Sequence, residues 1–323
     1  MNIVFAYHSG DCELALESAK AIVEQGVNIR HRAMVCCTDG TPLLPQITEE
    51  LKKVFPEVGR IIAQDGFDGW PLGPNQMFAD ASSHCYQYED PWYFWEPDCV
   101  PMVEGWVDKL EEEFNKNTGK IMGCFIEGGV APSGKIMYQL IVGSAVYPSK
   151  FLNGCKIAAN LYNYNIYFKD KSAAPEPWDV RCRWEFLQYG RDTPLIRAYW
   201  KSCNYQRRGE SIVFFAEDAE AQDVQNVTCP DRTVSPKAVV VHGCKDGSLH
   251  RMIYDKYSPP VYVEIEQPEE IVVQPLQSKV TFVASDNKTE SEKFLASLRS
   301  LGKTLGKPKK SRKKKKPQCK QNK

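Results

Sequence analysis

The sequence lacks the long hydrophobic runs that cross membranes. Its 323 residues contain no uninterrupted apolar stretch of about 18 or more. The beginning, MNIVFAYHSGD, also lacks the basic segment and the apolar core of a secretory signal peptide. These two absences lead us to expect a cytoplasmic protein without a transmembrane segment.

Paired metal-binding cysteines are missing as well. The twelve cysteines include no CxxC pair, and no group of Cys and His has the spacing of a zinc site. An apolar content of 42% and an aromatic content of 11% are typical of a globular protein with a sizeable core. We therefore expect most cysteines to be reduced, small core residues.

Acidic residues are absent from the end of the chain, which carries eleven Lys and Arg between 303 and 323. Removing these eleven from the 41 basic residues leaves 30 against 41 acidic ones, so residues 1–302 have a net charge of −11. Beyond about Tyr257 the sequence is rich in Pro, Glu and Gln and loses its periodicity. This composition predicts a folded domain over 1–256, a linker with a short helical arm over 257–302, and a disordered polybasic tail over 303–323.

Segments of strand length alternate with segments of helical periodicity. The expected strands are Asn2–Tyr7, His31–Thr38, Arg60–Gln64, Trp92–Trp95, Lys120–Ile126, Gln139–Tyr147 and Ala238–His242. The expected helices are Glu13–Glu24, Pro45–Phe55, Gln76–Tyr88, Trp106–Phe114 and Pro177–Gln188. This alternation predicts an α/β fold with a mostly parallel sheet flanked by helices.

Two carboxylates follow the aromatic strand in the segment YFWEPDCVPM. Glu96 and Asp98 lie on its exit loop, with Pro97 between them. The carboxyl end of a strand in an open α/β sheet is a common place for a ligand, and paired carboxylates there suit a hard divalent cation. The alternative is an ordinary solvated acidic turn.

This stretch resembles nucleotide-sugar glycosyltransferases of the GT-A fold, in particular the family 2-like enzymes. The shared features are Gly73-Pro74-Asn75, the aromatic strand, Glu96-Pro97-Asp98, Pro101 and Gly105-Trp106. The order of elements is similar over roughly residues 1–255. The resemblance implies a GT-A type, Rossmann-like sheet and transfer of a sugar from a nucleotide donor, with UDP-sugar expected. Glu96 stands where the family usually has Asp.

The resemblance also implies a second metal ligand far along the chain. His242 ends an apolar strand and is followed by Gly-Cys-Lys-Asp-Gly, so we expect Asp98 and His242 to bind Mn²⁺ or Mg²⁺. Lys245 would add a positive charge beside the donor diphosphate. The alternative interpretations are a histidine that only caps a strand and a lysine in a solvated turn.

Donor-binding residues are expected around the first strands. By resemblance, Tyr7, His8 and Asp11 face the ribose and base, Asp39 accepts from the uracil N–H, and Glu96 contacts sugar or ribose. The loop before the third helix adds Trp70 as a wall, Gly73 for close backbone approach, and Asn75 as a hydrogen-bond donor. Each of these is also an ordinary loop residue.

The acceptor hydroxyl must lose a proton, which calls for a carboxylate base in an inverting enzyme. Asp179 is our choice, because it lies beside Trp178 at a helix start, where an apolar setting would raise its pKa. Glu185 is the second candidate and Asp218 the third. Asp179 is alternatively a helix N-terminal acid that interacts with the helix dipole.

Residues 181–208 combine seven Lys and Arg with six aromatic residues and two acids. Together with the tail, this patch suggests an acceptor of opposite charge, and bacteriophage DNA glycosyltransferases are similar in being compact and acting on a polyanion. The acceptor would then be a hydroxymethylated pyrimidine extruded from DNA. Alternatives are a transferase for a surface glycan or protein, and a non-catalytic nucleic-acid-binding protein. The patch is alternatively an amphipathic core helix with a solvated basic face.

Overall fold

The computed structural model describes residues 1–67, 69–126, 140–150, 160–161, 163–166, 176–199, 203–215 and 233–255. All of them belong to one compact unit, Met1–Tyr262. The predicted linker, the helical arm and the polybasic tail lie outside the described residues. The domain boundary near residue 256 stays a prediction.

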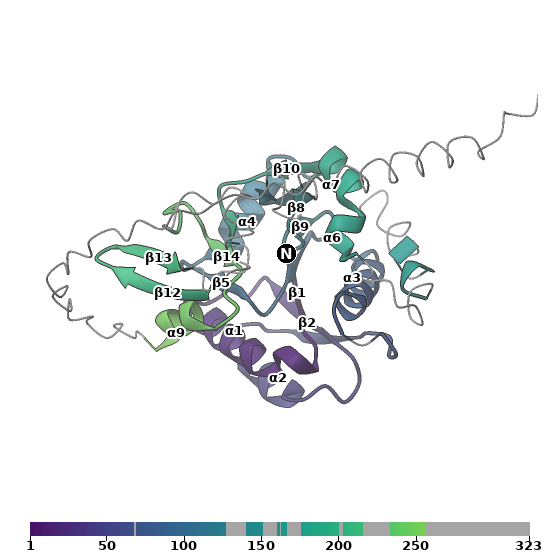
Figure 1. Cartoon of the computed structure of the whole chain (residues 1–323), viewed down its shortest axis with the longest axis horizontal. Coiled ribbons are helices and arrows are strands. Elements are labelled where there is room, and N and C mark those ends of the chain that lie inside the picture. The colour runs from purple at the N-terminus through teal and green to yellow at the C-terminus, as the bar shows by residue number, and fades with distance from the viewer. Residues whose placement is uncertain are drawn as a thin grey trace, which may run out of the picture. The chain divides into compact units, whose positions relative to one another are not determined.

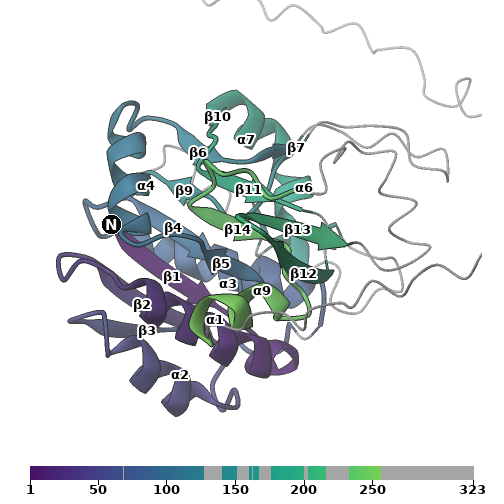
Figure 2. The same ribbon diagram turned by 90° about the vertical axis from the view of Figure 1, so that its left-hand side faces the viewer.

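A seven-stranded sheet forms the centre of this unit. Its order is β10 (Gly190–Asp192), β6 (Ile121–Gly123), β9 (Val146–Tyr147), β4 (Trp92–Trp95), β1 (Asn2–Ala6), β2 (Arg32–Cys37) and β3 (Val58–Ile62). Figure 2 shows this succession from β3 on one side to β10 on the other. All pairs are parallel except those of β9, which runs antiparallel to both β4 and β6. The expected mostly parallel α/β sheet is thus confirmed.

Helices cover both faces of the sheet. Neighbouring residues of a strand point to opposite sides, and both sets of side chains are apolar in the central strands, so both faces must be buried. Phe5 and Trp95 pack in a core with α1 (Cys12–Gln25), α2 (Leu44–Leu51) and α4 (Trp106–Asn115). Phe94 packs on the other side with α3 (Leu72–Cys85), α6 (Trp178–Arg181) and α7 (Arg183–Tyr189). In Figure 1, α1 and α3 lie on opposite sides of β1. Strands buried on both faces explain the continuous apolar runs of the sequence.

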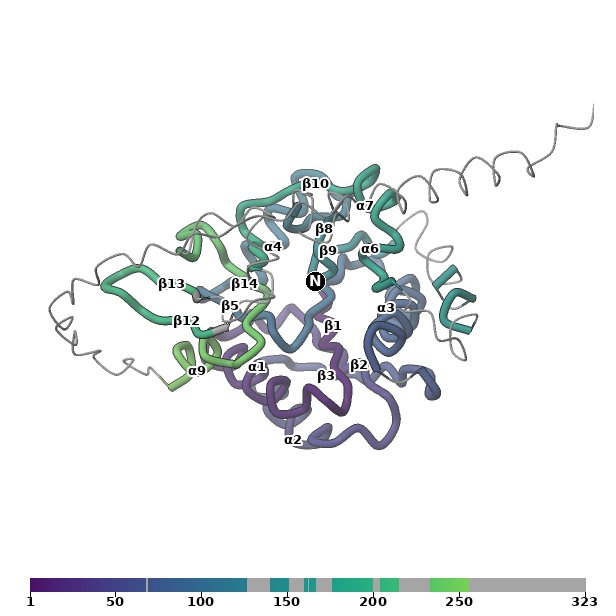
Figure 3. Tube along the Cα trace, viewed as in Figure 1, coloured from purple at the N-terminus to yellow at the C-terminus, as the bar shows by residue number. Residues whose placement is uncertain are grey.

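A smaller sheet lies next to the central one. It contains β11 (Ile196–Ala198), β14 (Val240–His242) and β5 (Cys99–Pro101), in that order. Its core continues into the hairpin β12 (Cys203–Arg208) and β13 (Ser211–Phe215) and into α9 (Ser248–Tyr254), through Val100, Val241 and Leu249. The Cα trace in Figure 3 shows β5 and β14, which are far apart in the sequence, side by side.

Several elements differ from the sequence-based expectation. Gln139–Tyr147 is two short strands, β8 (Leu140–Ile141) and β9, and β8 pairs with β7 (Phe125–Ile126). The chain between them passes under Trp178: a Cβ on Gly143 would lie 2.1 Å from the Trp178 ring, so the strand cannot continue with an ordinary residue there. The expected helix Pro177–Gln188 is interrupted at Cys182, which separates α6 from α7. Helix α3 begins at Leu72, four residues earlier than expected.

Trp178 is itself part of an aromatic cluster that holds α6 against α3. Its ring stacks on Phe78 with centroids 3.7 Å apart and an interplanar angle of 8°. Tyr147 and Phe186 complete the surroundings. Because Trp178 is only 3% exposed, its packing in the core anchors the backbone of its neighbour Asp179.

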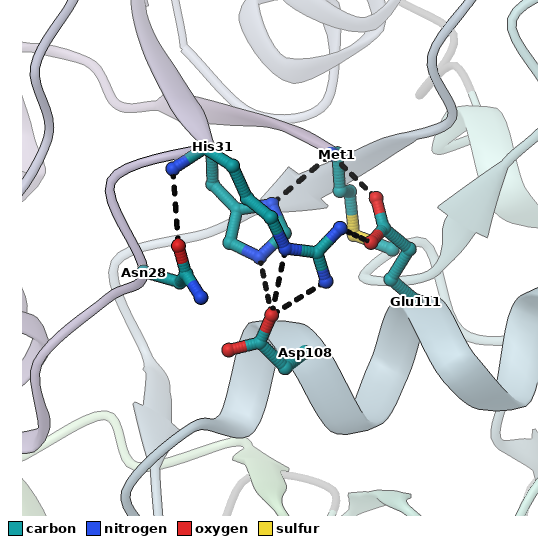
Figure 4. Close-up of polar contacts among 6 residues, drawn as sticks. Met1, Asn28, His31, Asp108 and Glu111 are labelled. Carbon is teal, nitrogen blue, oxygen red and sulfur yellow. Dashed lines mark hydrogen bonds and ion pairs between the residues drawn. The ribbon is translucent and has the colours of Figure 1, made fainter.

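The amino terminus is held in a buried polar cluster (Figure 4). The Met1 ammonium donates to Glu111 Oε1 at 2.8 Å and lies 3.1 Å from His31 Nδ1. An ammonium has only donors, so Nδ1 must accept and Nε2 donates to Asp108 Oδ1 at 3.1 Å. His31 is therefore neutral, and burial together with the nearby ammonium lowers its pKa.

Candidate active site

The small sheet brings the two expected metal ligands together. In the antiparallel pairing of β14 with β5, His242 lies opposite Cys99, the residue after Asp98. The Asp98 carbonyl then accepts hydrogen bonds from the N–H groups of Gly243 and Cys244, each at 3.1 Å. Gly243 has φ +110°, and a Cβ there would lie 2.0 Å from the Tyr199 carbonyl oxygen. Only glycine allows the chain to turn immediately after His242.

Two carboxylates and two cationic groups meet at this point. His242 Nε2 lies 3.2 Å from Asp98 Oδ1 and 3.1 Å from Glu96 Oε2, while Lys245 forms an ion pair with Asp98 Oδ2. The Asp98 side chain is 2% exposed, that of His242 15%, and that of Lys245 56%. The site is thus open to solvent on the Lys245 side and closed beneath Asp98.

The charges shift one another's protonation. Burial of the Asp98 carboxyl would raise its pKa, but His242 and Lys245 outweigh burial and hold that pKa well below its usual range. Burial would lower the pKa of His242, but Asp98 and Glu96 raise it to about 10. The pKa of Lys245 is raised by the same two carboxylates, against the effect of burial. A cation that binds the imidazole must therefore displace a proton.

Glu96 is oriented by a residue that the sequence did not single out. Ser144 Oγ donates to Glu96 Oε2 at 2.9 Å and accepts from the Cys99 thiol at 3.1 Å. Ser144 is fully buried in the turn between β8 and β9. A lone serine in an expected strand carries no signal that would have identified it.

The donor set fits a hard divalent cation. Both carboxylate oxygens of Asp98 and the Nε2 of His242 are buried and make no contact with hydrogen-bond geometry. Carboxylate oxygen and imidazole nitrogen are ligands that Mn²⁺ accepts, and Mg²⁺ shares the preference for oxygen. Asp98, Cys99 and His242 have ligand atoms within 4.8 Å of one another. Asp98 and His242 would hold the ion, with Glu96 beside it.

The loop after β1 lies near this cluster. His8 Nε2 is 2.8 Å from Asp11 Oδ2, and its Nδ1 accepts from the N–H of Gly10 at 2.9 Å. The hydrogen bond to Asp11 raises the pKa of His8, and Lys245 is close enough to lower it in part. Both side chains are about two-fifths exposed, at 40% and 39%. Tyr7, by contrast, is buried, and its hydroxyl donates to the Pro42 carbonyl at 3.2 Å.

Asp39 lies at the end of β2 and is 72% exposed. Arg60 on β3 donates to its Oδ1 at 2.8 Å, and this hydrogen bond lowers the pKa of Asp39. No pattern in the sequence singles out Arg60, which is the first residue of the strand expected there. Any base that Asp39 contacts would also meet this guanidinium.

The segment before α3 is arranged differently from the expected loop. Trp70 is 71% exposed, as a ligand-facing wall would require. Gly73 is already helical, and a Cβ there would lie 3.1 Å from the Phe67 carbonyl. Asn75 is fully buried and donates to Asn165 Oδ1 at 3.3 Å and to the Glu176 carbonyl at 3.1 Å. Its amide thus connects α3 to the chain that leads into α6.

Asp179 lies in the first turn of α6, next to the cluster of carboxylates. Burial raises the pKa of Asp179 to about 6, and the negative charge of Glu96 contributes. Its Oδ1 accepts from the N–H of Val180 at 2.8 Å. Glu185 is half-buried on α7, and Asp218 lies outside the described residues. The pKa of Asp179 is thus shifted towards neutrality, as a general base requires.

The basic and aromatic residues of 181–208 do not lie on one helix. Those that the structure describes are distributed over α6, α7, β10, β11, the residue after β11, and β12, so a single helix over this segment is wrong. Phe186 and Tyr205 are core residues, whereas Trp184 is 62% exposed. Arg191 is paired with Glu113 at 2.9 Å and Arg197 with Asp192 at 3.5 Å. These two guanidinium groups serve contacts within the protein.

No protein-family model and no curated protein sequence matches this chain. Several glycosyltransferases are among the solved structures with a similar backbone. The galactosyltransferase LgtC in complex with donor and acceptor sugar analogues is 12% identical with a TM-score of 0.47, over 80% of this chain and 97% of LgtC. The bifunctional glycosyltransferase WbbM is 10% identical with a TM-score of 0.41, over 75% of this chain and 45% of WbbM.

The glycosyltransferase GlyE from Streptococcus pneumoniae is 12% identical with a TM-score of 0.39, over 59% of this chain and 44% of GlyE. The chain therefore spans less than half the length of WbbM and GlyE. Within the described ranges, no helix is both long and apolar enough to span a membrane.

Proposed function

We propose that this protein is a metal-dependent glycosyltransferase that moves a sugar from a nucleotide-sugar donor, expected to be a UDP-sugar, to a hydroxyl acceptor. The observation that carries the proposal is the arrangement of Asp98, His242 and Lys245 at the carboxyl end of the parallel strands, with Asp179 beside them. Asp98 and the segment His242–Lys245 come from distant parts of the chain and meet through the small sheet.

Each group has a task in such a reaction. The acceptor oxygen forms a bond to the anomeric carbon, the sugar–phosphate bond breaks, and the nucleoside diphosphate leaves with the bonding electrons. Asp179 takes the acceptor proton, which a carboxyl of pKa about 6 does well near neutral pH. Mn²⁺ or Mg²⁺ held by Asp98 and His242 would neutralise charge on the diphosphate. Lys245, half-exposed beside Asp98, contacts the same phosphates as a mobile cation.

The donor nucleoside would lie over the loop after β1 and the end of β2. His8 and Asp11 are partly exposed there and Asp39 is exposed, and they offer an imidazole and two carboxylates to ribose hydroxyls and base N–H groups. Trp70 is available as a flat apolar surface. Tyr7 is buried and would act by supporting this surface, whereas the buried Asn75 would hold the chain that leads to Asp179.

The acceptor that we propose is a hydroxymethylated pyrimidine in DNA, with a surface glycan or protein as the second candidate. The support is the eleven-charge tail, since two described guanidinium groups of the 181–208 patch are committed to Glu113 and Asp192. A non-catalytic nucleic-acid-binding protein is the remaining alternative. The buried Asp98–His242 pair weighs against that alternative, because binding nucleic acid requires no such group.

One experiment separates these possibilities. The full chain is incubated with Mn²⁺ and a panel of nucleotide sugars, first alone to measure donor hydrolysis, then with hydroxymethylated DNA, plain DNA or a glycan. Mn²⁺-dependent release of nucleoside diphosphate supports the transferase. Sugar incorporation into hydroxymethylated but not plain DNA supports the DNA acceptor. DNA binding without hydrolysis of any donor would leave the non-catalytic alternative.

A further inference from the structure

A thiol lies among the residues of the proposed metal site. Cys99 directly follows Asp98 and faces His242 across the small sheet. Asp98, Cys99 and His242 each offer one possible metal-ligand atom, and these three atoms lie within 4.8 Å of one another. Cys99 and Asp98 are 0% and 1% exposed, so the three atoms meet at a buried point.

The backbone of Cys99 is fixed from the side away from the site. Its carbonyl accepts from Ser18 Oγ at 3.1 Å and from His250 Nε2 at 3.0 Å. Its N–H donates to the Glu96 carbonyl at 2.9 Å. With the backbone held on both sides, only rotation of the side chain can move the sulfur, and the three ligand atoms stay close together.

Ser144 lies between the thiol and Glu96. Its hydroxyl accepts from the Cys99 thiol at 3.1 Å and donates to Glu96 Oε2 at 2.9 Å. The site therefore offers two alternative ligand sets around Asp98 and His242. One adds the oxygens of Glu96, which suit Mn²⁺ or Mg²⁺, and the other adds the sulfur of Cys99, which suits Zn²⁺ and similar ions.

We propose that the site also binds a thiophilic divalent cation of the Zn²⁺ class through Asp98, Cys99 and His242. This cation competes with the catalytic Mn²⁺ or Mg²⁺, and the competition, unlike the binding itself, rests on the proposed function. Binding forms a sulfur–metal bond, and the thiol proton leaves to solvent. The separation of 3.2 Å between Asp98 Oδ1 and His242 Nε2 is compatible with two ligands about 2.0–2.2 Å from one tetrahedral ion.

The consequence for the reaction follows from charge. A divalent cation bound by one carboxylate and one neutral imidazole keeps a net positive charge for the diphosphate. A thiolate as third ligand cancels that charge. The thiophilic ion is therefore an inhibitor: it occupies the site of the catalytic ion but does not supply the positive charge that the diphosphate needs.

The test uses Cd²⁺ as the probe, because a cadmium–thiolate bond gives an ultraviolet charge-transfer band. The full chain, kept reduced and free of other metals, is titrated with Cd²⁺ as wild type, Cys99→Ser and Cys85→Ser. Cys85 is equally buried but does not belong to the candidate ligand group found among the described residues. Cys85→Ser is therefore the matched control. We expect a band that saturates near one equivalent in the wild type and Cys85→Ser. Excess Mn²⁺ should reduce it.

In Cys99→Ser the band should be lost, and the affinity for Cd²⁺ measured by calorimetry should fall at least about tenfold, the lower limit seen even for loss of an outer partner of a metal site. Asp98→Asn and His242→Gln should weaken the band while they leave every thiol in place, and they serve if Cys99→Ser does not fold. A band of equal affinity in Cys99→Ser, or a band that survives in both other variants, would overturn the proposal. Absence of sugar transfer with Mn²⁺ bears on the proposed function alone, since the Cd²⁺ band needs no substrate.

Discussion

Asn75 Nδ2 lies 3.1 Å from the carbonyl oxygen of Glu176, so helix α3 is tied to the chain just before the residue proposed as the base. Asn165 strengthens the connection by donating to the Leu72 carbonyl at 3.2 Å. A residue selected from the sequence as a donor contact is thus a support for Asp179. The two roles predict different kinetics.

Asn75→Ala should lower the turnover number with little effect on the donor KM. The free energy of unfolding should fall by about 1–3 kcal/mol, because the buried side-chain oxygen of Asn165 loses its donor. Steady-state kinetics and denaturant unfolding measure both effects. A large rise of the donor KM with normal turnover would instead return Asn75 to the donor-binding role.

Asp98→Asn should abolish transfer while the fold is retained, since the side chain keeps its shape. The expected loss is on the order of a hundredfold or more, the scale for removing a strong electrostatic stabiliser. Glu104→Gln is the control, because Glu104 is an exposed acid a few residues further along. Near-normal turnover of Asp98→Asn at saturating Mn²⁺, with unchanged Mn²⁺ affinity, would exclude Asp98 as a ligand.

The rate of transfer should rise with pH through about 6, the pKa to which burial raises Asp179. The sign follows from the task, because a base acts only when deprotonated and is protonated below its pKa. Asp179→Asn should lose this limb of the profile and about a hundredfold or more of the rate. Glu185→Gln should keep both. If Glu185→Gln loses the limb and Asp179→Asn keeps it, the two residues exchange roles.

Acid should destabilise the fold through His31. Its pKa is lower in the folded chain than in the unfolded one, so below about 6.5 the unfolded state binds the extra proton. This contribution is present above pH about 6.5 and is lost as the pH falls below it. We expect a smaller decrease in Tm between pH 7.5 and 5.5 for His31→Gln than for the wild type. Equal decreases would show that His31 is protonated in the folded chain.

Deletion of residues 303–323 should leave donor hydrolysis unchanged and raise the KM for hydroxymethylated DNA. Each phosphate neutralised by the tail contributes about 0.9 to the slope of log K against log salt, so the salt dependence should flatten. Measuring this KM at two salt concentrations, with and without the tail, checks both effects. Identical curves would remove DNA as the target of the tail and favour a glycan or protein acceptor.

The central sheet was predictable because its strands are buried on both faces. Phe94 and Trp95 point to opposite cores, and a run such as Trp92–Trp95 is the direct consequence. The short strands were not predictable in this way. Strand β5 begins two residues after Pro97, ends at Pro101, and is extended because it pairs with β14, a partner that its own sequence does not indicate.

The candidate site was predictable in its conspicuous members only. Asp98 follows the strand β4 and His242 is the last residue of β14, and the resemblance connected them across the chain. Ser144 and Cys99 had no such pattern, since a serine in a strand and a small buried thiol look like core residues. Their proposed roles depend on the contacts of Ser144 with Glu96 and Cys99. These contacts join distant residues and cannot be read from the sequence around any one of them.

The stacked pair of Trp178 and Phe78 makes the proposed base as immobile as the hydrophobic core. Any movement that carried Asp179 away from the acceptor would have to pull an indole out of its aromatic surroundings into water. Such a movement would shift the emission of Trp178 to longer wavelengths, and the difference between the wild type and Trp178→Phe would isolate this signal from the other tryptophans. The protein thus contains its own fluorescent reporter for the opening of α6, which can be followed on the timescale of turnover without any added label.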